Sequence, residues 1–233
     1  MTVEIDQLVD WLRRFRALVV QNQALLTELD SAIGDADHGS NMARGMNAVA
    51  EKLHGESSET VDALFKGVGM TLVSSVGGAS GPLYGTFFLR FGTSTGAVTA
   101  LDAGGLSAAL RAGLGGVVTR GKAEAGDKTM LDAMIPAVDA LDTALAAGRD
   151  LAAASAEAAA AAAAGRDATE PLVARKGRAS YLGDRSAGHV DPGATSTALL
   201  FEALAAALAG PAAAAESDSA AEPGPASAPD PTP

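Results

Sequence analysis

Apolar residues recur at helical spacing along most of this 233-residue chain, and this periodicity constrains the fold more than any other feature. Leu8, Leu12, Phe15 and Val19, for example, share one face of a helix predicted over 3–29. No segment has the pattern of a convincing strand, so the sequence predicts an all-α fold of about eight helices. The predicted helical segments are 3–29, 41–53, 59–75, 82–96, 106–121, 131–145, 150–164 and the stretch that follows Asp191.

Composition narrows the class of protein further. Hydrophobic residues make up 48% of the chain but aromatic residues only 4%, and alanine dominates the apolar share, which favours helices packed closely through small side chains. The net charge of −11 argues against nucleic acid as a partner. The chain has no cysteine, which excludes disulfides, thiolate metal sites and a cysteine nucleophile.

The sequence shows neither the pattern of a signal peptide nor that of a membrane-spanning segment. The first residues lack the basic-then-apolar pattern of a signal peptide, and the alanine-rich run at 152–164 is too weakly hydrophobic to span a bilayer and carries Glu157. No membrane partner and a cytoplasmic location are therefore expected. Six of the ten prolines lie at or after residue 211, so we expect one domain over 1–209 and a disordered, acidic tail over 210–233.

The stretch 30–41 is the first candidate site. It places Asp30, Asp35 and Asp37 within eight residues, directly before a His-Gly-Ser-Asn run at the expected start of a helix. Crowded carboxylates suit a hard divalent cation such as magnesium, and helix N-termini attract phosphate. A solvated turn with Asp37 as N-cap explains the same residues about equally well. The spacing does not fit an EF-hand.

Three later joins also carry unusual residues. The stretch 77–85 is glycine-rich and predicts either an anion-binding nest or a tight helix–helix turn, with Ser80 as N-cap and Pro82 in the first helical turn. The stretch 116–123 nearly matches a P-loop, but it lacks the final Ser or Thr and a preceding strand, so we reject it.

The remaining two stretches, 126–132 and 175–193, are a predicted helix start and a basic loop. In 126–132, Asp127 is a candidate cap, and Met130 lies either against a base or in the core. The loop 175–193 holds the densest basic cluster, Arg175, Lys176 and Arg178, which suits phosphate charge. It ends with Asp191 and Pro192, the predicted N-cap and N1 of the last helix, and its His189 is either at a ligand surface or structural.

These four joins are expected to meet. In an antiparallel up-and-down bundle the joins fall alternately at the two ends, so 30–41, 77–81, 121–130 and 175–193 could gather at one mouth. That mouth would combine acidic residues for metal, glycines for phosphate, a methionine for a base and arginines for charge.

The same blocks resemble a known family, the nucleotide-binding L subunits of bacterial dihydroxyacetone kinases. The resemblance covers roughly residues 1–209 and is carried by 29–45, 77–85, 126–133 and 175–196. The acidic block of the family usually reads Gly-Asp-Gly-Asp-His-Gly, and here Ala36 replaces the middle glycine. The change leaves the carboxylates in place and affects only the backbone angle of the turn.

The resemblance implies an eight-helix antiparallel barrel with a nucleotide at one end, held by two Mg²⁺ ions. It implies ADP or ATP as cofactor, a separate K subunit that binds dihydroxyacetone, and a phosphohistidine carrier M subunit that recharges the bound ADP. The implied metal ligands are Asp30, Asp35 and Asp37. The implied nucleotide contacts are His38, Gly39, Ser40, Asn41, Ala79, Ser80, Gly121, Met130, Arg178, Asp191, Pro192 and Gly193.

Other readings of the resemblance stay open at this point. The same domain occurs in ATP-dependent dihydroxyacetone kinases and resembles part of bacterial fatty-acid kinases, so an L-type subunit with freely exchanging nucleotide is an alternative. A homodimer and contact with a transcription regulator are two further assemblies compatible with the family. A purely structural helical bundle would require four site-like joins to coincide.

Overall fold

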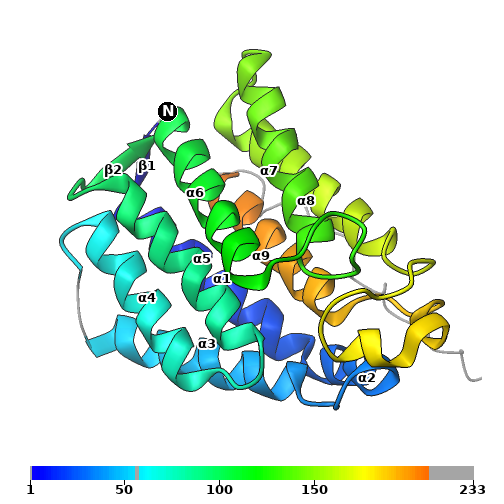
Figure 1. The fold of residues 1–233 in the computed structure, drawn as a ribbon. Coiled ribbons are helices and arrows are strands. Elements are labelled where there is room, and N and C mark those ends of the chain that lie inside the picture. The colour runs from blue at the N-terminus through cyan, green and yellow to red at the C-terminus, as the bar shows by residue number, and fades with distance from the viewer. Residues whose placement is uncertain (1, 56–57, 210–233) are drawn as a thin grey trace, which may run out of the picture.

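The computed structural model describes residues 2–55 and 58–209 and is built almost entirely from helices (Figure 1). The expected disorder over 210–233 therefore lies outside the described residues. The α-helices are α1 Ile5–Gln21, α2 Gln23–Ile33, α3 His38–Gly55, α4 Val61–Ser75, α5 Ser80–Thr95, α6 Ala103–Gly121, α7 Leu131–Ala146, α8 Leu151–Asp167 and α9 Pro192–Leu208. The 3₁₀ helix η1 spans Arg178–Ser186, and the strands are β1 Thr2–Glu4 and β2 Ala100–Asp102.

The all-α prediction is confirmed, with two local corrections. The single helix predicted over 3–29 is divided into α1 and α2 at Asn22, whose side-chain N–H donates to the carbonyl of Leu18 at 2.9 Å. Counting α1 and α2 as one broken helix gives the predicted eight. The expectation of no strand is wrong, because β1 and β2 pair antiparallel with Val3 opposite Leu101.

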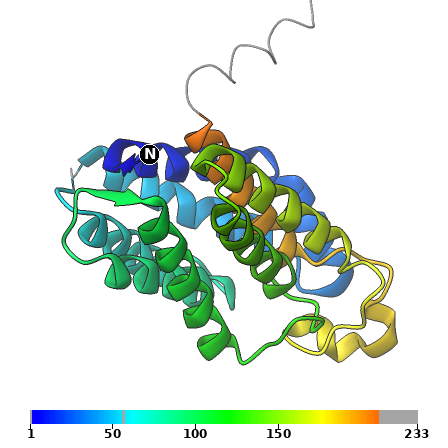
Figure 2. The same cartoon turned by 90° about the horizontal axis from the view of Figure 1, so that it is seen from above.

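The helices run up and down, and neighbours along the chain pack together. Helices α4 and α5, α5 and α6, α7 and α8, and α8 and α9 are the main sequential pairs. Helix α9 also packs on α1 and α7 and is buried on almost every side, as its apolar sequence requires (Figures 1 and 2). The last helix therefore packs on the first, which closes the bundle around one core.

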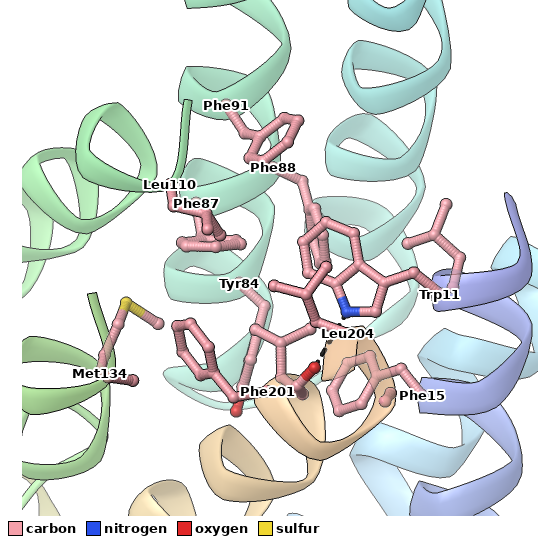
Figure 3. Packing of buried hydrophobic residues seen from close by; sticks show 14 of the residues in the cluster. Trp11, Phe15, Tyr84, Phe87, Phe88, Phe91, Leu110, Met134, Phe201 and Leu204 are labelled. Carbon is pink, nitrogen blue, oxygen red and sulfur yellow. Dashed lines mark hydrogen bonds between the residues drawn. The ribbon is translucent and has the colours of Figure 1, made fainter. Parts of the chain in front are cut away.

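The aromatic residues form the centre of this core (Figure 3). Trp11 is fully buried, and its ring lies 5.7 Å from Phe65 and 5.8 Å from Phe91, centroid to centroid. Its indole N–H donates to the carbonyl of Leu200 in α9 at 2.9 Å. One side chain thus joins α1, α4, α5 and α9.

The alanine-rich segment is a helix and not a linker. Helix α8 begins after Asp150, whose carboxylate accepts the N–H of Ala153 at 2.8 Å, and it buries Ala154, Ala158 and Ala162. Small side chains on this face let the helix approach α7 and α9 closely. Within the described part of the chain, no helix is both long and apolar enough to cross a membrane.

The up-and-down order places the four unusual joins at one end of the bundle. These are the joins between α2 and α3, α4 and α5, α6 and α7, and α8 and α9. The β1–β2 ribbon lies at the opposite end, where α5 meets α6 (Figure 1). In the first of the four joins, Ala36 has a φ of +62°, a left-handed conformation that is unfavourable for any residue with a Cβ.

We expect Trp11→Ala to lower the free energy of unfolding by about 3–5 kcal/mol, because it leaves a large cavity and removes the indole hydrogen bond to the Leu200 carbonyl. Met70→Ala is the control, since Met70 is 63% exposed, and it should change stability by less than about 0.5 kcal/mol. Urea denaturation measures both. Equal losses in the two variants would contradict the packing described.

Ala36→Gly should raise the free energy of unfolding by up to about 1 kcal/mol, because glycine adopts the left-handed backbone without a Cβ clash. The same change at Ala160, an exposed position inside α8, should have the opposite sign and cost about 1 kcal/mol. Thermal and urea unfolding of the two variants give the signs. A loss of stability in both would mean that Ala36 is not strained.

Candidate functional site

The acidic turn brings its three carboxylates together. Asp30 lies in the last turn of α2, while Asp35 and Asp37 lie in the turn that leads to α3. One ligand oxygen of each lies within 4.8 Å of the other two. Asp30 is only 8% exposed, and its Oδ2 accepts the backbone N–H groups of Asp37 at 2.8 Å and His38 at 3.1 Å. The buried carboxylate therefore fixes the path of the turn.

Two glycines allow this geometry by close approach. A Cβ on Gly34 would collide with Oδ1 of Asp30, and a Cβ on Gly39 would collide with the Gln23 carbonyl in α2. Gly34 thus lets the carboxylate of Asp30 lie against the turn. Gly39 lets α3 begin directly beside α2, which places its N-terminal end next to the carboxylates.

The donor set of the turn fits a hard divalent cation. Its side-chain donors are carboxylate oxygens, the ligands that Mg²⁺ and Ca²⁺ prefer, and Asp35 and Asp37 remain partly or fully exposed for further ligands. The guanidinium of Arg178 forms an ion pair with Asp35, with Nε lying 3.0 Å from Oδ2. This ion pair, with Arg178 69% exposed, joins the acidic turn to the basic loop.

The glycine-rich join lies beside the acidic turn. Gly78 has a φ of +64°, and a Cβ on Gly77 would be within 2.8 Å of the amide oxygen of Asn41. Helix α5 begins at Ser80 with Ala79 at its N-cap position and no side-chain cap, so the predicted N-cap role of Ser80 is wrong. The hydroxyl of Ser80 instead lies 3.0 Å from Nδ1 of His38.

A chain of buried polar groups extends from this point into the core. Nε2 of His38 lies 2.9 Å from Oγ of Ser196, which is 2.7 Å from the hydroxyl of Tyr84. Burial lowers the pKa of His38, against the opposing effect of the Asp30 and Asp37 carboxylates. Burial also raises the pKa of Tyr84 to about 12, which keeps its hydroxyl protonated. The imidazole is therefore held in place at both ring nitrogens.

The joins surround a cavity of about 190 Å³. Most of the residues singled out from the sequence line it, from all three remaining joins as well as the acidic turn. Those that line it are Asp30, Asp35, Asp37, His38, Ala79, Ser80, Met130, Arg178, Asp191, Pro192 and Gly193.

Four of the metal and nucleotide residues implied by the family resemblance do not line this cavity. Ser40 is exposed and its hydroxyl donates to the carbonyl of Asp37, Asn41 accepts from Arg44, and Gly39 packs on α2. Gly121 lies in an adjacent, mostly apolar cavity of about 260 Å³. The two cavities lie side by side and are together called the groove here; the wall residues that they share are Ala79, Leu83, Thr129, Lys176 and Gly177.

The helix start at α7 and the basic loop differ partly from expectation. Asp127 caps the turn by accepting the N–H of Glu124 at 2.9 Å and is not the cap of α7, which begins at Leu131. Asp191 is the N-cap of α9, as predicted, and accepts the N–H of Ala194 at 2.7 Å. Burial raises the pKa of Asp191 to about 7. His189 is exposed, and its carbonyl accepts from Lys128.

Sequence reasoning missed several residues of the cavity and its support. Lys128 and Thr129 line the wall beside Met130, and Tyr84 and Ser196 hold His38 from behind. The signal for Lys128 was a single lysine between Asp127 and Thr129 in a polar turn, which by itself is ordinary.

The family is shown by comparison with known proteins. Residues 32–206 match the model of the DAK2 domain. The chain is 47% identical over 204 residues to PEP-dependent dihydroxyacetone kinase 1, ADP-binding subunit DhaL, of Listeria innocua, covering 88% of this chain and 97% of that protein. It is 45% identical to the corresponding subunit of Escherichia coli K12, covering 88% of this chain and 98% of the relative.

Solved structures and a more distant relative agree with this assignment. Triokinase/FMN cyclase of Homo sapiens is 35% identical, with 77% of this chain matching 31% of that protein. The dihydroxyacetone kinase of C. freundii in complex with AMP-PNP and Mg²⁺ superposes with a TM-score of 0.64 at 30% identity, covering 84% of this chain and 33% of that one. The chain therefore belongs to the DAK2 domain family, whose dihydroxyacetone kinase subunits it resembles over most of its length.

Proposed function

We propose that this chain is the nucleotide-carrying subunit of a dihydroxyacetone kinase, with magnesium-bound ADP or ATP in the groove at the open end of the bundle. The observation that supports this most strongly is the juxtaposition of three carboxylates, a glycine-rich helix start and a basic loop around one cavity. The L. innocua and E. coli relatives carry the name ADP-binding subunit and match over nearly their full length.

Each wall of the groove has a proposed task. Asp30, Asp35 and Asp37 would hold two Mg²⁺ ions, and the residues around the starts of α3 and α5 would receive the phosphates. The apolar cavity that Gly121 lines, together with Met130 in the wall of the adjoining cavity, would take the adenine and ribose. Arg178 and the start of α9 would close the phosphate end. The proposed nucleotide contacts are His38, Gly39, Ser40, Asn41, Ala79, Ser80, Gly121, Met130, Arg178, Asp191, Pro192 and Gly193.

The bound nucleotide would relay a phosphoryl group between two partner subunits. The N–P bond of a phosphohistidine on the carrier M subunit would break as a new P–O bond forms on ADP. The bond between the γ-phosphorus and ADP would then break as that phosphorus bonds to a hydroxyl oxygen of dihydroxyacetone on the K subunit, and the hydroxyl proton would pass to solvent. Side chains of this chain would form no covalent bond. They would position the phosphates and offset charge in the transition state.

A second candidate is a subunit that exchanges ATP freely and uses it as the direct donor. The similarity to a dihydroxyacetone kinase crystallised with AMP-PNP, an analogue of ATP, favours it. The two candidates share the same groove and differ only in how long the nucleotide stays and what recharges it.

Asp37→Asn should weaken ADP binding in the presence of Mg²⁺ by at least about tenfold, or about 1.4 kcal/mol, because one of three carboxylate ligands loses its charge. The stability of the protein without metal should be unchanged or higher, since repulsion within the turn falls. Titration calorimetry and thermal unfolding measure the two effects. EDTA should abolish ADP binding by the wild type.

Asp6→Asn is the matched control, because Asp6 is an exposed carboxylate in the first turn of α1, outside the acidic turn. It should leave the affinity for magnesium-bound ADP within about twofold of the wild type. Equal affinity of Asp37→Asn and the wild type would contradict the proposed metal site.

A further inference from the structure

The ammonium group of Lys128 lies at the centre of a cradle of backbone carbonyls. The side chain is buried, with 1% of it exposed, although lysine is rarely buried without a charged partner. Nζ lies 3.3 Å from the carbonyl oxygen of Glu170, 3.0 Å from that of Leu172, 2.7 Å from that of Ser186 and 2.5 Å from that of His189, so its three N–H donors are shared among four acceptors. The partners are neutral main-chain atoms, so the arrangement differs from a buried ion pair.

The four carbonyls belong to two segments, here called stems, that lie before and after the tip of the basic loop, residues 176–178. Glu170 and Leu172 precede its tip, while Ser186 and His189 follow it. Other bonds close the stems on each other, such as the N–H of Gly188 to the carbonyl of Glu170 at 2.8 Å. Lys128 also ties both stems to the join between α6 and α7.

The tip that these stems carry forms one wall of the cavity. Lys176, Gly177 and Arg178 line it from the loop, and Thr129 and Met130 line it from the residues that follow Lys128. The backbone N–H of Arg175 donates to the carbonyl of Asp127 at 3.0 Å, a second link between the same two segments. The ammonium group therefore lies where the two segments that form these walls of the site meet.

Two energetic costs accompany this position. Lys128 has a φ of +63°, a left-handed backbone conformation that favours glycine. Burial lowers the pKa of its ammonium group, although the nearby charges of Asp191 and Glu170 raise it. Such costs persist where the surrounding structure needs the residue, often at functional sites.

We propose that Lys128 is a positioning residue for nucleotide binding, whose ammonium group holds the basic loop against the phosphate end of the cavity. The inference rests on the proposed function, because the ligand that the loop would cover is the magnesium-bound nucleotide. A neutral side chain of similar length would leave the carbonyls without their common donor. The loop would then separate from the α6–α7 join and carry Arg178 away from Asp35.

Lys128→Met tests this, with Lys122→Met as the matched control. Lys122 has the same side chain and a left-handed φ of +50°, but it is exposed at the C-cap of α6. In calorimetric titrations with ADP and Mg²⁺, Lys128→Met should bind at least about tenfold more weakly, and Lys122→Met within about twofold of the wild type. Hydrogen exchange should accelerate at residues 174–188 of Lys128→Met and stay unchanged in α9.

Chemical rescue distinguishes positioning by the ammonium group from a general loss of stability. In Lys128→Ala, methylammonium chloride should occupy the cradle and restore at least part of the lost affinity, whereas sodium chloride at the same ionic strength should not. If Lys128→Met fails to fold, Lys128→Ala with methylammonium decides the question. Recovery of both fold and affinity supports the proposal, while recovery of the fold without affinity, or no recovery, overturns it.

The wild type separates failure of this inference from failure of the proposed function. A wild type that does not bind ADP with Mg²⁺ would remove the proposed function and the inference with it. A wild type that binds, together with a Lys128→Met variant that binds equally well, would overturn the role of Lys128 alone.

Discussion

The carboxylate of Asp30 accepts the backbone N–H groups of both Asp37 and His38, and these two hydrogen bonds decide where the acidic turn meets α3. The other carboxylate oxygen, Oδ1, lies so close to Gly34 that a Cβ at that position would collide with it. The start of α3 and the close approach of the three carboxylates depend on this contact. The site is thus built into a helix junction of the bundle.

The same end of the bundle concentrates charge of both signs. Asp35 is partly balanced by Arg178, and this exposed ion pair is worth little in stability, so it can open at low cost. The buried ammonium group of Lys128 donates to main-chain carbonyls, with the charges of Asp191 and Glu170 nearby. A fixed cradle beside an easily opened ion pair suits a loop that must stay near a ligand and still admit it.

Helical periodicity predicted the bundle, because each amphipathic face is a local property of the sequence. Topology then predicted that the joins would meet, and the residues pointed to the acidic turn and to Asp191 as the N-cap of α9. The full set of nucleotide contacts came only from the family resemblance. The break at Asn22 was missed because the apolar pattern continues across it, and the three-residue strands were too short to show alternation. The cradle was out of reach, since Lys128 bonds to main-chain oxygens 42 to 61 residues away, which no residue type reveals.

The nucleotide content of the protein, purified without added nucleotide, denatured and separated by chromatography, tests the central claim most directly. The account predicts close to one equivalent of ADP, retained through dialysis and lost when a chelator is present, because the carboxylates hold it through Mg²⁺. A protein that arrives empty but binds ATP weakly would favour the freely exchanging kinase. Absence of nucleotide together with no magnesium-dependent binding would contradict the site built on Asp30, Asp35 and Asp37.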